Sequence, residues 1–120
     1  MAIKFAISAF VWAPVVLVLA GDMGQSVEVT FKAKFRRMKA SERQVLLKEL
    51  QDKTITDKAL LDRVLVDWAD LTDADGNAVP FTPDARQEAT EEMAGLEAEL
   101  VVSYFNFVFN PKKDDAAKNS

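Results

Sequence analysis

Hydrophobic and polar residues alternate along the segment SVEVTFKAKFRR, from Ser26 to Arg37. Successive side chains of a strand point to opposite faces, so this period of two predicts a β-strand with one buried and one wet face. The preceding run Ala9–Ala20, AFVWAPVVLVLA, is almost entirely apolar, and the Gly-containing loop Gly21–Gln25 separates the two. Two β-rich runs joined by a short loop predict an antiparallel hairpin.

The apolar run also resembles a secretory leader, because Lys4 precedes it. Cleavage near Ala20 would remove the strand that the second run needs as its partner, which argues against a leader. The run is shorter than the ~20 apolar residues of a membrane span, and Pro14 interrupts it. We therefore expect no cleaved signal peptide, no transmembrane segment and an intracellular location. The run is interpreted as an inner strand, with Ile3, Phe5 and Ile7 as an added edge strand.

Helical patterns follow the hairpin. Ser41 with Gln44 three residues later forms a capping box, which predicts a helix start. This helix carries a one-sided apolar stripe of Val45, Leu46, Leu47 and Leu50. Thr54 or Thr56 opens a second predicted helix that runs through Trp68. Its apolar residues recur at helical spacing and bury one face: Leu60, Leu61, Val64, Leu65 and Trp68.

The remaining chain predicts a turn and further helix. Asp73–Asn77 has turn composition, with Gly76 available for a positive φ. Thr82 followed by Pro83 is a helix start, and the helical pattern resumes after Gly95 and ends at Asn110–Pro111. The predicted fold class is α+β, with an N-terminal antiparallel β-hairpin or small sheet packed against about four α-helices. Residues 1–110 form one domain in this prediction, β-rich over about 1–38 and helical over 41–110, and residues 111–120 form a flexible polar tail.

The composition disfavours an enzyme. The 120 residues include no His and no Cys, which removes the commonest general base and the commonest metal ligands. Asp73–Gly76 resembles part of a calcium loop, but Leu71 and Thr82 then occupy the first and twelfth positions, where acidic ligands are required. The acidic residues of the segment 91–99 are expected to form a solvated helix face. We expect no catalytic residues, no cofactor and no metal.

Charge is unevenly distributed although the net charge is only −4. The end of the second strand is basic, whereas the segments 57–75 and 84–99 are acidic. This pattern allows complementarity within the chain, attraction between identical subunits, or simple solvated faces. The candidate self-association patch consists of Lys32, Lys34, Arg36 and Arg37. Nucleic-acid binding is disfavoured because the basic stretch is short and the other segments would repel phosphate.

Aromatic residues gather near the end of the chain. Tyr104, Phe105, Phe107 and Phe109 place four rings in six residues, pointing in several directions around a helix. Either this helix is buried between layers or part of the ring set is a partner surface. Trp68 and Phe81 are expected to lie in the core, but they are kept as candidates for partner binding. The candidate partner-binding residues are therefore Trp68, Phe81, Tyr104, Phe105, Phe107 and Phe109.

The order of several segments resembles the tail assembly chaperones of long-tailed, siphovirus-type bacteriophages and prophages, over about residues 1–109. The similar segments, in order, are Met1–Ala6, Pro14–Val18, Thr30–Met38, Leu60–Trp68 and Thr72–Thr82. The resemblance implies a non-enzymatic protein that binds the tape-measure protein before the tail tube polymerises around it. It also implies the tail tube protein as a possible further partner and the cytoplasm of the bacterial host as the location. A homo-oligomer is a further possibility, which the uneven charge allows. The alternative is a structural tail component, a tube or completion protein that stays in the virion.

Overall fold

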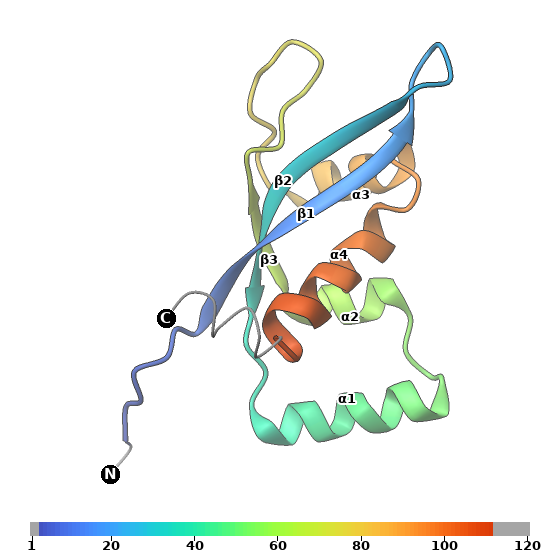
Figure 1. The fold of residues 1–120 in the computed structure, drawn as a ribbon. Helices are drawn as coiled ribbons and strands as arrows, with labels where there is room; N and C mark the ends of the chain where they lie inside the picture. The colour runs from blue at the N-terminus through green and yellow to red at the C-terminus, as the bar shows by residue number, and fades with distance from the viewer. Residues whose placement is uncertain (1–2, 112–120) are drawn as a thin grey trace.

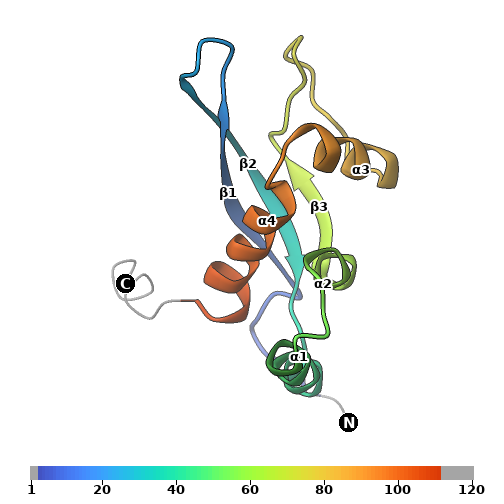
Figure 2. The ribbon, with the colours of Figure 1, turned by 90° about the vertical axis from the view of Figure 1, so that its right-hand side faces the viewer.

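The computed structural model describes residues 3–111, which form a sheet layer and a helix layer (Figure 1). The sheet has three antiparallel strands, and α2, α3 and α4 lie on one side of it (Figure 2). This arrangement confirms the predicted α+β class. The predicted polar tail, apart from Pro111, lies outside the described residues.

The predicted hairpin is confirmed. Strands β1 (Phe10–Ala20) and β2 (Ser26–Arg36) pair along their whole length in one unbroken register. The backbone N–H of Gly21 donates to the carbonyl of Gln25 at 2.7 Å and closes the hairpin loop. Gly24 adopts a φ of 79° in this loop, a conformation that glycine reaches without a steric penalty.

The third strand was not predicted. Helix α2 (Asp57–Val64) ends four residues earlier than its apolar stripe suggests, and β3 (Leu65–Ala69) pairs with β2 so that Trp68 lies opposite Ala33. The expectation that the second helix runs through Trp68 is therefore wrong. Leu65 and Trp68 are buried in the strand, and the free edge of β2 gains backbone hydrogen bonds that a longer helix would not supply.

Strand β1 is an edge strand, because the strand order is β1-β2-β3. The prediction that the apolar run is an inner strand is thus wrong, and so is the added strand at its side. Ile3, Phe5 and Ile7 precede β1 outside any strand and are 75%, 72% and 69% exposed. Toward the N-terminus the chain leaves the sheet at Ala9, whose carbonyl accepts a hydrogen bond from the backbone N–H of Arg37.

Helix α1 (Ala40–Asp52) lies at one end of the molecule, beyond the sheet (Figure 1). It begins before the predicted cap: Lys39 is the N-cap, and the Glu42 carboxylate accepts a hydrogen bond from its backbone N–H at 2.9 Å. Of the predicted apolar stripe only Leu46 is buried; Val45, Leu47 and Leu50 are exposed. The stripe predicted a helix correctly but overestimated how much of it is covered.

The other helices close the core. They are α3 (Pro83–Glu92), which the Thr82 hydroxyl caps through the N–H of Ala85, α4 (Leu96–Tyr104), and the π-helical turn η1 (Phe105–Phe109). One hydrophobic core joins the inner face of the sheet to α2 and α4. Its largest fully buried side chains are Tyr104, Phe35, Leu46, Leu61, Leu96, Leu100, Val15 and Val64.

Candidate functional site on the open face of the sheet

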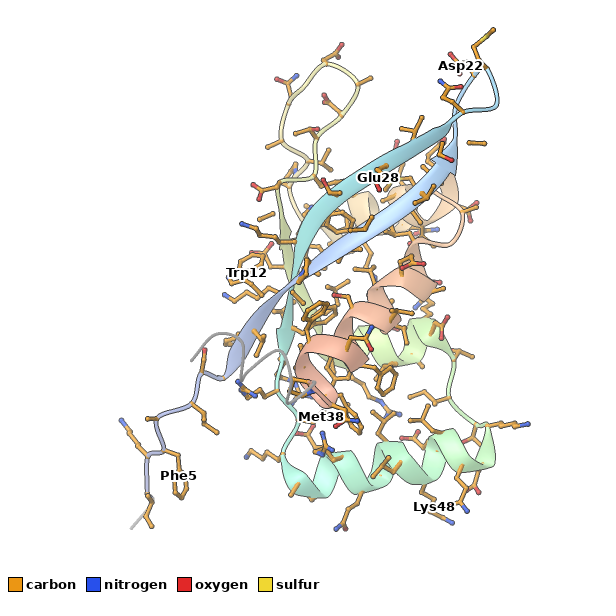
Figure 3. All side chains as sticks on the ribbon, viewed as in Figure 1. Phe5, Trp12, Asp22, Glu28, Met38 and Lys48 are labelled. Atoms are coloured by element: carbon orange, nitrogen blue, oxygen red, sulfur yellow. The ribbon has the colours of Figure 1, made fainter. Side chains whose placement is uncertain are left out.

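The sheet face turned away from the helices carries a row of large apolar side chains. Phe10, Trp12, Val16 and Val18 of β1 are 41%, 46%, 47% and 56% exposed, whereas the alternate residues of the strand face the core. Figure 3 shows the Trp12 side chain pointing away from the helices. We call these four residues the β1 row. Contiguous exposed apolar surface of this kind is typical of a binding surface.

Polar side chains of β2 flank the β1 row. The hairpin register sets Trp12 opposite Lys34, and Val16 opposite Thr30. The Lys34 ammonium lies 4.9 Å from the ring centroid of Phe10 and 5.6 Å from that of Trp12. Attraction between the cation and the two ring faces favours this position. The surface therefore combines exposed rings with a positive charge held above them.

An open hollow lies next to Trp12. It is lined by Trp12, Pro14, Lys32 and Asp70, among others. The Lys32 ammonium lies 3.6 Å from the Asp70 carboxylate, but both side chains are well exposed. An ion pair in water contributes little to stability. Lys32 or Asp70 can therefore bind a charged group of another protein at little cost in stability.

The predicted basic patch is partly used within the chain. Arg36 donates two hydrogen bonds to the Glu42 carboxylate, at 3.0 and 2.9 Å, and Arg37 donates to the carbonyl of Ser8. The Arg36 hydrogen bonds, with that from Lys39, lower the pKa of Glu42 to about 2. Arg36 thus fixes α1 to the end of β2. Of the four predicted residues, Lys32 and Lys34 are those that lie on the open face.

Trp68 is a core residue. Its side chain is 4% exposed, its indole N–H donates to the carbonyl of Val79 at 2.7 Å, and its ring contacts Phe31 and Phe81 edge-on. Phe81 is half-buried against it, with ring centroids 4.9 Å apart. These contacts anchor the loop after β3, and Trp68 offers no surface to a partner.

The terminal aromatic residues divide between core and surface. Tyr104 is 1% exposed and contacts Phe35, and burial raises the pKa of its hydroxyl. Phe105 and Phe109 are half-buried and contact both Tyr104 and each other. Phe107 is 43% exposed. The structure thus brings three of the four rings together as packing and leaves Phe107 on the surface.

The β1 row was not among the predicted site residues. The run Ala9–Ala20 is apolar on both faces, so its own pattern does not show which residues are exposed. The signal lies in β2: a short hairpin loop fixes the register, and the register sets Trp12 opposite Lys34 on the wet face.

The rest of the described chain offers little else. Within residues 3–111 no group of three or more acidic side chains could hold a metal ion, and no helix has the length and apolar character needed to cross a membrane. Comparison with known proteins gave no match to a protein-family model, to a curated protein or to a solved structure. The open face of the sheet is therefore the evidence on function.

Proposed function

We propose that the chain is a non-enzymatic tail assembly chaperone of a long-tailed bacteriophage or prophage, which covers apolar segments of the tape-measure protein before the tube forms. The observation that carries the binding role is the exposed β1 row with Lys34 above two of its rings. The identity of the client rests on the resemblance of the sequence segments to that family.

The β1 row suits an amphipathic client segment. Burying an aromatic or branched aliphatic side chain contributes about 1.5–3 kcal/mol, and large rings commonly dominate binding energy at interfaces. Lys32 and Lys34 stand on the adjacent strand, so a client whose apolar stripe is bordered by carboxylates matches this surface. A long helical protein with such stripes needs cover until the tube encloses it.

Co-expression with the tape-measure protein of the same phage tests this function. The wild-type chain should keep the client in the soluble fraction and co-purify with it. The double variant Trp12→Ser, Val16→Ser should lose the client while its circular dichroism spectrum stays unchanged. The control Val45→Ser, Leu47→Ser removes equally exposed apolar side chains from α1 and should retain the client.

Purified phage particles separate the chaperone from a structural tail component. A chaperone should be present in the infected cell and missing from finished particles by immunoblot. Stoichiometric recovery of the chain in particles would contradict the proposal and assign it to the tail structure. Loss of client solubility with the α1 control but not with the β1 variant would move the client site to α1.

A further inference from the structure

We propose that the end of β1, from Val16 to Ala20, pairs with the same segment of a second copy and joins two sheets into one of six strands. This inference concerns self-association and does not depend on the identity of the client. It rests on which backbone groups face the free edge, on what already occupies part of that edge, and on the lack of charge along it.

The hydrogen bonds that flank β1 show which residues face outward. The N–H of Arg37 donates to Ala9 and the N–H of Gly21 donates to Gln25, so the odd-numbered residues of this register are the ones bonded to β2. In an antiparallel pair bonded and non-bonded residues alternate. The even-numbered residues of β1 therefore turn their N–H and C=O groups to the free edge, Val16 and Val18 among them.

The first half of this edge is already occupied. Pro14 has no N–H, and its carbonyl accepts a 2.7 Å hydrogen bond from the hydroxyl of Ser103 in α4. Leu17 still lies beside Gly95, the N-cap of α4, and the end of the hairpin with its loop projects past α4, as both ribbon views show (Figures 1 and 2). Within residues 3–111 no hydrogen bond other than the ladder to β2 engages the backbone of Val16 or Val18.

The projecting half lacks the usual protection of an edge strand. Natural edges are blunted by charged side chains, proline, bulges or short length. The 11 residues of β1 include no charged residue, and proline occurs only at position 14. The opposite edge differs: β3 has 5 residues, pairs with β2 across a register shift, and carries Asp67. The two edges thus differ in how readily they accept another strand.

A second copy matches the β1 edge better than an unrelated strand does. Antiparallel pairing centred on Val18 sets Val16 opposite Ala20 of the partner, and Leu17 opposite Leu19 of the partner, so apolar meets apolar on both faces. No like charges face each other, because the segment has none. The half-buried side chain of Leu19 gains cover. A two-fold pairing uses the β1 edge of each copy. No β1 edge is then left free, so assembly stops at the dimer.

Sedimentation over a range of protein concentrations tests the dimer. The wild-type chain should change from monomer to dimer as concentration rises. Val18→Pro removes an outward N–H without removing a bond to β2, as Pro14 already does in the same strand, and should remain monomeric. Val18→Thr keeps the N–H and a β-branched side chain and should still dimerise. A monomeric wild type, or a Val18→Pro variant that dimerises like wild type, would overturn the proposal.

A second variant guards against misfolding of the proline variant. Val18→Lys keeps the backbone N–H but places two ammonium groups together at the two-fold axis, and should also be monomeric. Hydrogen exchange should slow at the amides of Val16 and Val18 on raising the concentration. Suppose instead that exchange slows only in α1 and that Val18→Pro and Val18→Lys still dimerise. This result would place the dimer contact on α1 and refute the edge pairing.

Discussion

The hydroxyl of Ser103 in α4 donates a 2.7 Å hydrogen bond to the carbonyl of Pro14 in β1, across 89 positions of sequence. Ser103 is the one buried polar residue in the described chain, at 4% exposure. The bond ties the last helix to the first strand and satisfies a carbonyl that proline leaves facing the edge of the sheet. Ser103 is buried whereas Pro14 is exposed, so the bond lies at the border between the core and the free edge of the sheet.

We expect Ser103→Ala to lower the free energy of unfolding by about 0.5–1.5 kcal/mol, because the hydrogen bond to the Pro14 carbonyl is lost. Urea denaturation followed by circular dichroism measures this change. Thr90→Ala is the matched control, since the Thr90 hydroxyl bonds only to the Arg86 carbonyl of its own helix, and it should cost less than about 0.5 kcal/mol. Equal losses for the two variants would contradict the special role of Ser103.

Acid should weaken the attachment of α1. The pKa of Glu42 is lowered from 4.5 to about 2 by hydrogen bonds from Arg36 and then from Lys39. A carboxyl group with a lowered pKa in the folded state contributes stability above its unfolded pKa and loses it as pH falls. This contribution is therefore complete above about pH 4.5 and disappears as pH falls toward 2.

Glu42→Gln tests this directly. The variant should be less stable than wild type at pH 7, and the difference should shrink between pH 4.5 and 2, by urea denaturation at each pH. Asp52→Asn is the control, because the ion pair of Asp52 with Lys48 is long at 3.6 Å and exposed; its difference from wild type should stay small throughout. A Glu42→Gln difference that is independent of pH would show that Arg36 does not favour the charged carboxylate.

The hairpin could be predicted because its evidence is local: alternation in β2 and a short loop. The third strand could not, since Leu65 and Trp68 fit the apolar face of a helix as well as the inner face of a strand. What decides between them is the unpaired edge of β2, a tertiary requirement that the local pattern does not contain. The edge position of β1 was missed for the same reason.

The candidate site shows a similar limit. A cluster of aromatic residues in the sequence suggests a binding surface, but Tyr104 is buried whereas Phe107, three residues later, is exposed. Only the packing of α4 and η1 on the sheet distinguishes them. Trp12 lies in a uniformly apolar run and shows its exposure only through its partner Lys34 in the hairpin register. Surface and core were thus separable from the local pattern at β2, at β1 only through its register with β2, and not in the helical segment that contains Tyr104 and Phe107.

The two tryptophans should report on the open face and the core separately. Trp12 is 46% exposed, whereas Trp68 is 4% exposed and its indole N–H is bonded to the Val79 carbonyl. Acrylamide should quench the emission of Trp68→Phe, which retains Trp12, more strongly than that of Trp12→Phe. Client binding should reduce the quenching of Trp12 in the Trp68→Phe variant and leave the quenching of Trp68 in the Trp12→Phe variant unchanged. Equal quenching of the two variants would show that Trp12 is not on the surface.

Trp68→Phe should also destabilise the fold, because the Val79 carbonyl loses its indole partner and the smaller ring leaves a void beside Phe81. We therefore expect a lower urea midpoint for this variant than for Trp12→Phe. The quenching measurement must accordingly be made without denaturant, and circular dichroism should confirm that both variants are folded.

Phe107 and Tyr104 give the sharpest test of how the terminal aromatic residues divide. Tyr104→Ser removes a ring that contacts Phe35, Phe105 and Phe109 at 1% exposure, and loss of a large buried side chain costs about 3–5 kcal/mol. That is a large share of the 5–15 kcal/mol that stabilises a typical domain, so the variant should unfold at a much lower temperature. Phe107→Ser should keep the wild-type melting temperature within a few degrees, because its ring is 43% exposed.

The same pair of variants separates packing from recognition. If Phe107 belongs to the client surface, Phe107→Ser should lower client recovery in the co-expression assay while remaining folded. If the β1 row alone binds the client, recovery should match wild type. A Phe107→Ser variant that melts as early as Tyr104→Ser would mean that the exposed ring is needed for folding, and the division of the aromatic set would be wrong.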